Sequence, residues 1–135
     1  MSAEAALLAA LRGALLGDAA VQAALGDPAR VYDDHPPDPV FPYATLGAIE
    51  TRSADAAGVA GLEHLATFHV WSRYGGRAEA LAAIDAARAA LHDRALSVAG
   101  RRLVLLLATF ADVFRAGDGR TTHGVLRVRA ITEAA

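Results

Sequence analysis

Cysteine and lysine are both absent from this chain of 135 residues. Without a thiol, disulfides, thiolate metal sites and a cysteine nucleophile are all excluded. The 13 basic residues are therefore all arginine, and against 15 acidic residues they leave a formal net charge of −2. A chain so close to neutrality lacks the broad positive field with which nucleic-acid-binding domains attract phosphates.

Large apolar side chains are scarcer than the overall composition suggests. Hydrophobic residues make up 54% of the chain, but 34 residues are alanine. Alanine removes little area from water, so the core is expected to rest on Leu, Val and a few aromatic residues. No apolar stretch is long enough to cross a bilayer, and Glu4 and Arg12 interrupt the N-terminal segment where a signal peptide would be apolar. The length indicates one domain, expected to be soluble and made in the cytoplasm.

Three helices are expected from apolar spacing and from capping residues. One helix is expected over residues 2–16, with Ser2 as its predicted N-cap. A second is expected over residues 19–25, with Asp18 as its predicted N-cap. A third helix is expected over residues 77–92, where a glycine pair ends the preceding strand. Its predicted buried stripe consists of Leu81, Ile84, Ala87 and Leu91.

Four strands are expected from runs of β-branched, aromatic and alternating residues. They cover residues 43–51, 63–73, 102–114 and 124–132. The loop 52–61 makes the first two a hairpin with a long tip. The run from Leu103 to Phe110 is apolar on both faces, which favours a central place in the sheet for its strand.

Residues 33–42 contain four prolines and are expected to form an ordered, extended arm, neither helix nor central strand. The order of the elements favours an α+β fold, with an antiparallel sheet of about four strands packed against one long helix and an N-terminal helix.

Candidate catalytic groups are few. Asp33, Asp34, His35 and Asp38 are the densest set of possible metal ligands, but the intervening prolines hold the chain extended and favour a solvated turn. His64 and His69 lie five residues apart on a strand, so they are expected on opposite faces, where they cannot share a metal. No nucleophile elbow, Walker loop or dinucleotide fingerprint is present. The sequence therefore predicts no enzyme, no cofactor and no metal site.

The remaining candidates are surfaces. Trp71, Arg73 and Tyr74 end a strand together, a composition typical of interface hot spots. Arg127 and Arg129 alternate outward on the last strand, where they can pair with carboxylates of a neighbouring molecule. The full set of candidate interface residues is Arg52, Asp55, Trp71, Arg73, Tyr74, Arg127 and Arg129.

Three segments together carry a family resemblance. They are Asp38-Pro-Val-Phe-Pro-Tyr-Ala-Thr-Leu-Gly47, Phe68-His-Val-Trp-Ser-Arg-Tyr-Gly-Gly-Arg77 and Asp118-Gly-Arg-Thr-Thr-His-Gly-Val-Leu126. In these segments and in the order of its elements, the chain resembles the phage tail terminator family, also called tail completion or tail-to-head joining proteins. The family occurs in siphophage-like particles and in gene transfer agents. The resemblance extends from the first helix to residue 132, with residues 69–76 as its most specific part.

This resemblance implies a single terminator-like domain over residues 1–135 that forms a hexameric ring at the head-proximal end of the tail tube. Such a ring stops tube polymerisation and joins tail to head. The implied partners are further copies of the chain, the tail tube protein and the head completion or connector proteins, with DNA passing through the lumen without specific binding and no membrane contact. The implied location is the head–tail junction of a virion or phage-like particle, after synthesis in a bacterial cytoplasm.

Two alternatives remain open from the residues alone. One is another head–tail connector or head-closure subunit, because such a protein shares the small α+β profile without a cofactor. The other is a small metal-dependent hydrolase that uses Asp33, Asp34 and His35.

Overall fold

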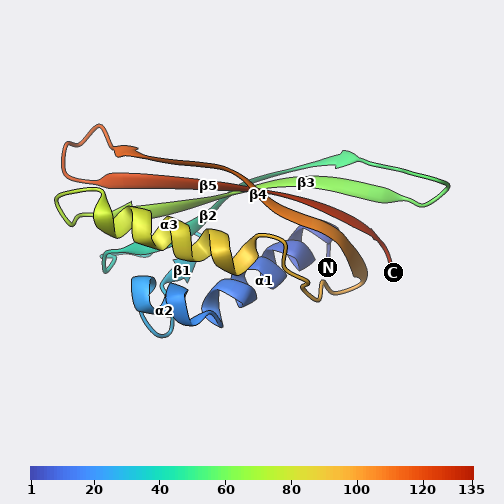
Figure 1. The fold of residues 1–135 in the computed structure, drawn as a ribbon, viewed down its shortest axis with the longest axis horizontal. Helices are drawn as coiled ribbons and strands as arrows, with labels where there is room; N and C mark the ends of the chain where they lie inside the picture. The colour runs from blue at the N-terminus through green and yellow to red at the C-terminus, as the bar shows by residue number, and fades with distance from the viewer.

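Three helices lie on one face of a five-stranded sheet in the computed structural model, which describes residues 1–135 (Figure 1). The elements are α1 (Ala3–Leu16), α2 (Ala19–Leu25), β1 (Val31–Tyr32), β2 (Tyr43–Ser53), β3 (Gly61–Ser72), α3 (Ala78–Leu91), β4 (Arg101–Arg115) and β5 (Thr122–Ala134). The strand order is β1-β2-β3-β5-β4, and every neighbouring pair is antiparallel except β1–β2. The predicted α+β class is confirmed. The fifth strand, β1, has only two residues and gave no periodic signal in the sequence.

The two N-terminal helices begin where the capping residues predict. The Ser2 Oγ accepts a hydrogen bond from the Ala5 N–H at 3.0 Å, and the Asp18 Oδ1 accepts one from the Val21 N–H at 3.0 Å. Each bond satisfies a backbone donor that the first turn of a helix leaves without a partner. Leu11 of α1 is fully buried.

Helix α3 lies across β3, β5 and β4 and packs against α1 and α2. Ile84, Ala87 and Leu91 of its predicted stripe are buried, but the predicted burial of Leu81 is wrong, because 49% of this residue is exposed. The buried positions of α3 include five alanines, whose small side chains let the helix approach the sheet and α2 closely. Leu81 lies outside that alanine-rich surface.

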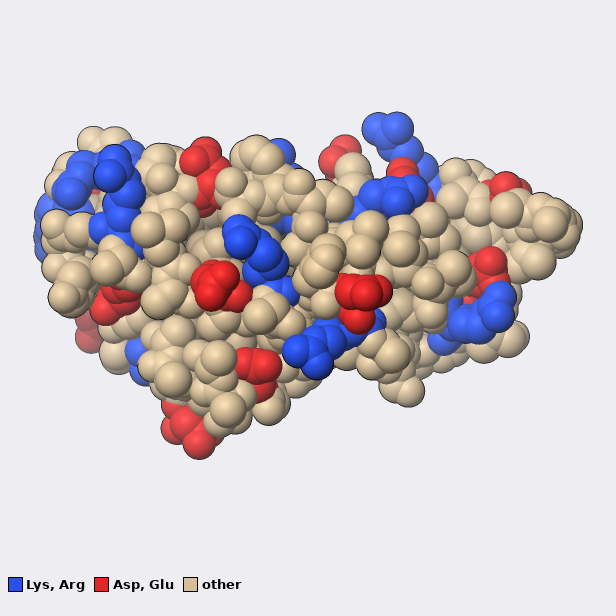
Figure 2. Space-filling view, in the orientation of Figure 1, with Lys and Arg blue, Asp and Glu red and all other residues tan.

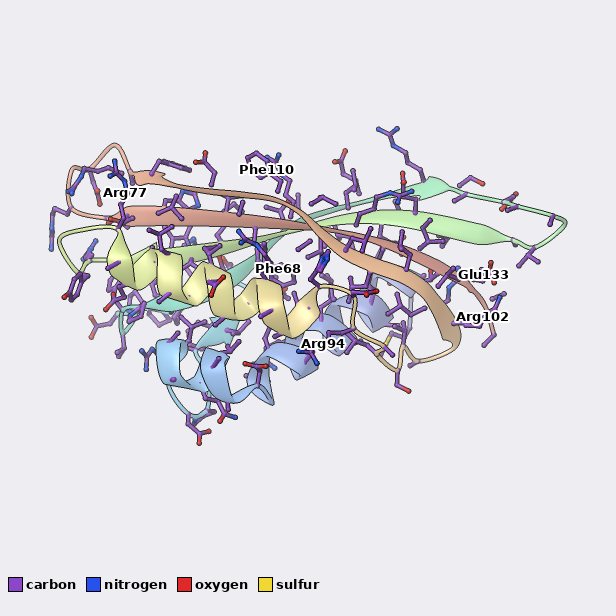
Figure 3. The ribbon with its side chains drawn as sticks, viewed as in Figure 1. Phe68, Arg77, Arg94, Arg102, Phe110 and Glu133 are labelled. Carbon is purple, nitrogen blue, oxygen red and sulfur yellow. The ribbon has the colours of Figure 1, made fainter.

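The core lies between the sheet and the helices. On β3, Ala66 and Phe68 face inward, and on β5, Leu126 and Val128 do so, each at most 2% exposed. Phe68 lies between the sheet and α3, whereas Phe110 lies on the opposite side of the sheet (Figure 3). These inward positions alternate along each strand with outward ones, and β3 and β5 are neighbours in the interior of the sheet.

Strand β4 is an edge strand, so its predicted central position is wrong. Its inward side chains, such as Leu106, join the core. Its outward side chains include Val104, Phe110 and Phe114 beside the charged Asp112, and no helix covers them. Phe110 and Phe114 remain 43% and 39% exposed. Apolar side chains on both faces of a strand indicate that both faces pack against something. They do not indicate that the strand has a neighbouring strand at both of its edges.

The β2–β3 hairpin extends beyond the helical layer (Figure 1). Strand β2 continues two residues past the predicted end, to Ser53, and Asp55 closes the tip by accepting a hydrogen bond from the Gly61 N–H at 3.1 Å. None of the helices combines the length and the apolar character needed to span a membrane.

Candidate interaction surface

A row of rings crosses one end of the uncovered face of the sheet, which we call the outer face. Trp71 on β3 stacks on His123 on β5, with ring centroids 4.0 Å apart and planes 19° from parallel. The Phe114 ring on β4 lies 4.9 Å from the His123 ring, centroid to centroid. His69 Nδ1 and His123 Nε2 are 2.8 Å apart and share a hydrogen bond. The row ties together three neighbouring strands.

Gly47 on β2 provides the space for the His69 ring. A Cβ atom at this position would lie 2.6 Å from His69 Nε2 and 2.9 Å from the backbone oxygen of Thr67. The register between β2 and β3 shifts between Leu46 and Ile49, so Gly47 lies within the irregularity. A bulge with glycine is a common way to bring a side chain from the neighbouring strand close to the backbone.

The proline-rich arm, residues 33–42, packs onto the same end of the outer face. The His35 ring lies 4.9 Å from the Trp71 ring, and its Nδ1 is 2.9 Å from the Tyr43 hydroxyl. The Arg73 guanidinium lies 4.4 Å above the Phe41 ring, a cation–π contact. The arm contains neither helix nor strand, as predicted, and these contacts hold it on the sheet.

Burial lowers the pKa of both His69 and His123. Electrostatic repulsion lowers the pKa further, from His35 and Arg127 for His69 and from His69 and His35 for His123, whereas Asp112 raises that of His123. Both imidazoles are therefore neutral at neutral pH, so one ring donates its N–H and the other accepts through its lone pair.

The two arginines predicted on β5 have different surroundings. The Arg129 Nε lies 2.6 Å from the Glu63 carboxylate on β3, so its charge already has a partner within the chain. Arg127 is exposed, and its guanidinium lies 4.5 Å from the centre of the Phe110 ring. Arg127 is thus the one of the pair that presents a charge to solvent without an ion-pair partner.

The other predicted interface residues lie at the two ends of the sheet. Trp71 is half-buried, and its Nε1 donates to the Thr45 hydroxyl at 3.1 Å. Tyr74, 68% exposed, follows β3 at the same end. Arg52 and Asp55 are exposed at the opposite end, on the β2–β3 hairpin. The seven predicted residues therefore form no single patch.

Sequence reasoning did not single out His35, Tyr43, Phe110 and Phe114 as members of this surface. Alternation along each strand places Phe110 and Phe114 on one face, but only the pairing of β4 with β5 brings Phe114 opposite His123. The four residues span the arm, β2 and β4, so no local motif joins them.

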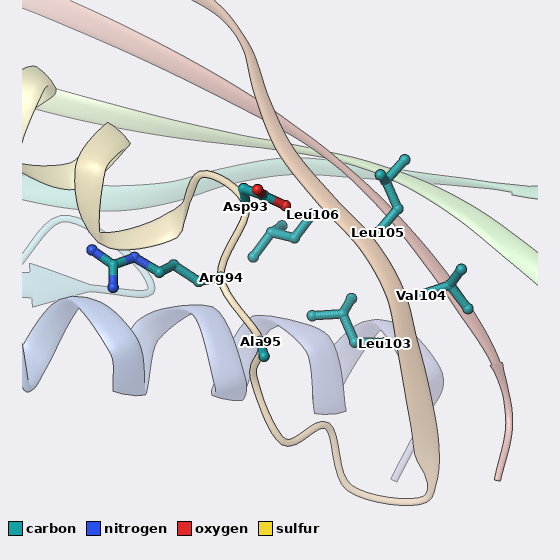
Figure 4. Close-up of a pocket in the computed structure, with 7 residues that line it drawn as sticks. All are labelled: Asp93, Arg94, Ala95, Leu103, Val104, Leu105 and Leu106. Carbon is teal, nitrogen blue, oxygen red and sulfur yellow. The ribbon is translucent and has the colours of Figure 1, made fainter.

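The hollows of the molecule do not bring catalytic groups together. A shallow hollow of about 200 Å³ lies where the segment after α3 meets β4, lined mainly by aliphatic residues 103–106 (Figure 4). Asp93, Arg94 and Ala95 form the rest of its wall, and the Arg94 Nε donates to the Ala89 carbonyl at 3.2 Å. No group of three or more His, Cys, Asp or Glu residues is arranged to hold a metal ion.

An uncovered sheet face with exposed Phe110 and Phe114, and no cluster of metal-ligating residues, is typical of a structural subunit. The family model for Tail completion protein gp17 matches residues 9–133. The chain belongs to this family, whose members are structural virion proteins and not enzymes.

A solved structure is similar over nearly the whole chain. One chain of the structure described as "Virion of native gene transfer agent (GTA) particle" has a TM-score of 0.89 and 31% sequence identity, with 98% of each chain covered. No curated protein sequence matches the chain. The fold and the family therefore agree with the resemblance found in the three sequence segments.

Proposed function

We propose that the chain forms a ring at the head-proximal end of a tail tube, where it stops tube polymerisation and joins the tail to the head, with DNA passing through the ring. The observation that carries this proposal is the match of one domain, end to end, to a chain of a gene transfer agent virion. Membership in the tail completion family supports it.

The surface of the domain fits a subunit of an assembly. Exposed Phe110 and Phe114 lie on the outer face of the sheet, where an isolated soluble domain would more often carry polar residues. A ring needs an interface on two sides of each subunit, and each stable interface buries roughly 1,200–2,000 Å². The ring is proposed to be hexameric, with the tail tube protein on one side and head connector proteins on the other.

The test is electron microscopy of particles from a strain that lacks this gene. The proposal expects overlong tails, or tails of normal length detached from filled heads. Complementation with the intact gene must restore joined particles of normal tail length. Joined particles of normal length in the deletion strain would contradict the proposal. Heads that have lost their DNA through an unclosed portal, together with tails of normal length, would instead indicate a head-closure subunit.

A further inference from the structure

The free part of the β4 edge lies next to two exposed arginines. The turn after α3 covers the middle of this edge, because the Asp93 N–H donates to the Leu106 carbonyl at 2.8 Å and the Ala108 N–H donates to His92 Nδ1 at 3.0 Å. Residues 109–115 have no such neighbour on that edge. An exposed edge strand with apolar side chains is a surface on which another chain can pack.

The β4–β5 turn adds positive charge to this surface. Arg115 and Arg120 are exposed, and neither is in one of the two ion pairs of the chain. Asp118 in the same turn is a carboxylate that accepts hydrogen bonds from the Thr121 hydroxyl and from the backbone N–H groups of residues 120 and 121. Its negative charge offsets one of the two arginines, so residues 115–121 keep one net positive charge. Figure 2 shows basic side chains grouped at this end of the molecule. We call Phe114, Arg115 and Arg120 the basic edge.

The proline-rich arm has complementary chemistry. Asp33, Asp34 and Asp38 are exposed and have no ion-pair partner within the chain. Val40 is 63% exposed, so the arm also offers an apolar side chain. We call these four residues the acidic arm.

The acidic arm and the basic edge lie at the same end of the sheet but at opposite edges of it. The arm connects β1 and β2, at one edge of the strand order, and its His35 contacts Trp71 near the end of β3. The turn with Arg115 and Arg120 joins β4, at the other edge, to β5. Figure 1 shows the arm and this turn at the end of the molecule away from the β2–β3 hairpin tip. Two copies placed side by side in the same orientation can therefore set the arm of one against the basic edge of the next.

We infer that the acidic arm of one copy packs on the basic edge of a neighbouring copy, as a head-to-tail contact that repeats around the ring. The occupant is a second copy of this chain because the chain itself supplies both complementary surfaces. A heterologous contact of this kind closes into a ring when its rotation divides a full turn. This inference rests on the ring proposed above.

Side chains carry this contact. The prolines of the arm have no N–H, so the arm cannot complete a ladder of hydrogen bonds along β4. Carboxylates of the arm meet the guanidinium groups of Arg115 and Arg120, and Val40 covers the exposed part of Phe114. Attraction between exposed charges is screened by salt, so assembly weakens as ionic strength rises.

Cysteine cross-linking tests the contact directly, because the chain has no cysteine of its own. Particles are made in the deletion strain with the double variant Asp34→Cys, Arg120→Cys, treated with a short bis-maleimide and run on a denaturing gel. The expected result is a ladder of covalent multimers of this chain. Each single variant is expected to give only the monomer. The control pair Asp85→Cys, Arg120→Cys uses an exposed residue on α3 and is also expected to give no ladder.

Three outcomes would overturn the inference. The double variant gives no ladder in joined particles, a single variant gives a dimer through a two-fold contact, or Asp34→Cys cross-links to a protein of different mass such as the tube subunit. All three are readable in particles whose tails are joined, so each leaves the proposed function intact. A deletion strain with normal particles would contradict the proposed function instead.

Charge reversal gives a second test that does not depend on cross-linking geometry. The variant Arg115→Glu, Arg120→Glu is expected to lower the yield of joined particles at least tenfold. Adding Asp33→Arg and Asp34→Arg to the same chain is expected to restore most of the yield. Circular dichroism must show that the first variant is folded. A folded first variant with unchanged yield, or the absence of any rescue, would contradict the contact.

Discussion

The indole of Trp71 stacks on the imidazole of His123 with 4.0 Å between ring centroids, although 52 positions separate the two residues in the chain. The two are direct partners in the register of β3 and β5. The contact joins the two central strands at the end of the sheet where the arm, the β4–β5 turn and the start of α3 come together. Removing it is expected to affect the fold and the proposed interface together.

Trp71→Ala is expected to lower the free energy of unfolding by about 2–4 kcal/mol. The substitution removes a half-buried ring, its stacking contact with His123 and its hydrogen bond to Thr45. Denaturant unfolding measures the change. Tyr74→Ala is the control at a neighbouring aromatic that is 68% exposed, with an expected change within about 0.5 kcal/mol. Equal losses for both variants would show that the stack adds nothing to stability.

The stability of the protein is expected to fall as pH falls below about 6.5, the ordinary pKa of histidine. Burial lowers the pKa of His64, His69 and His123 in the folded state, so the unfolded chain binds protons that the folded chain does not. The contribution of each neutral histidine is therefore present above pH 6.5 and decreases as pH falls toward its folded pKa.

Denaturant unfolding at pH 7.5 and pH 5.5 measures this effect. The variant His69→Gln, His123→Gln is expected to show a smaller difference between the two pH values than the unmodified chain, since only His64 then contributes. The same difference in both proteins would rule out the histidine pair as a source of the pH dependence.

Gly124→Ala is expected to destabilise the protein by about 1–3 kcal/mol through overpacking. A Cβ atom at Gly124 would lie 2.9 Å from Ile84 Cγ1 and 3.1 Å from its Cδ1. The substitution should cost less in an Ile84→Ala background, where these atoms are absent. A double-mutant cycle on unfolding free energies measures the coupling, and additive costs would show that Ile84 is not the limiting contact.

Leu126→Ala is expected to lower the free energy of unfolding by about 2–5 kcal/mol, because Leu126 is fully buried in the core. Leu81→Ala is the matched control on α3. Leu81 is 49% exposed, so the expected loss of unfolding free energy is below about 1 kcal/mol. Thermal unfolding of the two variants compares them. A loss at Leu81 as large as that at Leu126 would show that Leu81 belongs to the buried core, as its sequence spacing predicts.

Much of the fold was predictable because its signals are local. Ser2 and Asp18 start their helices through hydrogen bonds that reach three residues along the chain. The inward faces of β3 and β5 follow from alternation, which a strand imposes on adjacent residues. Strand β1 was missed because two residues are too few to show a period.

The candidate surface was predictable only in part. Trp71, Arg73 and Tyr74 were found from composition, and the structure places them at the end of the sheet where the ring cluster lies. The partner of Arg129 was not predictable, because Glu63 lies 66 positions away and becomes its neighbour only through the pairing of β3 with β5. The same holds for His69 and His123.

The sequence by itself determined the α+β class, the helix starts, the extended arm and the exclusion of thiol chemistry. Each follows from residue identity or from forces that act over a few positions. The tertiary structure alone decided that β4 lies at the edge, that its second apolar face stays uncovered, and that the arm and the β4–β5 turn share one end of the sheet. Strand order and register depend on long-range pairing, since a run such as Leu103 to Phe110 is equally apolar whether a strand of its own chain or another molecule covers it.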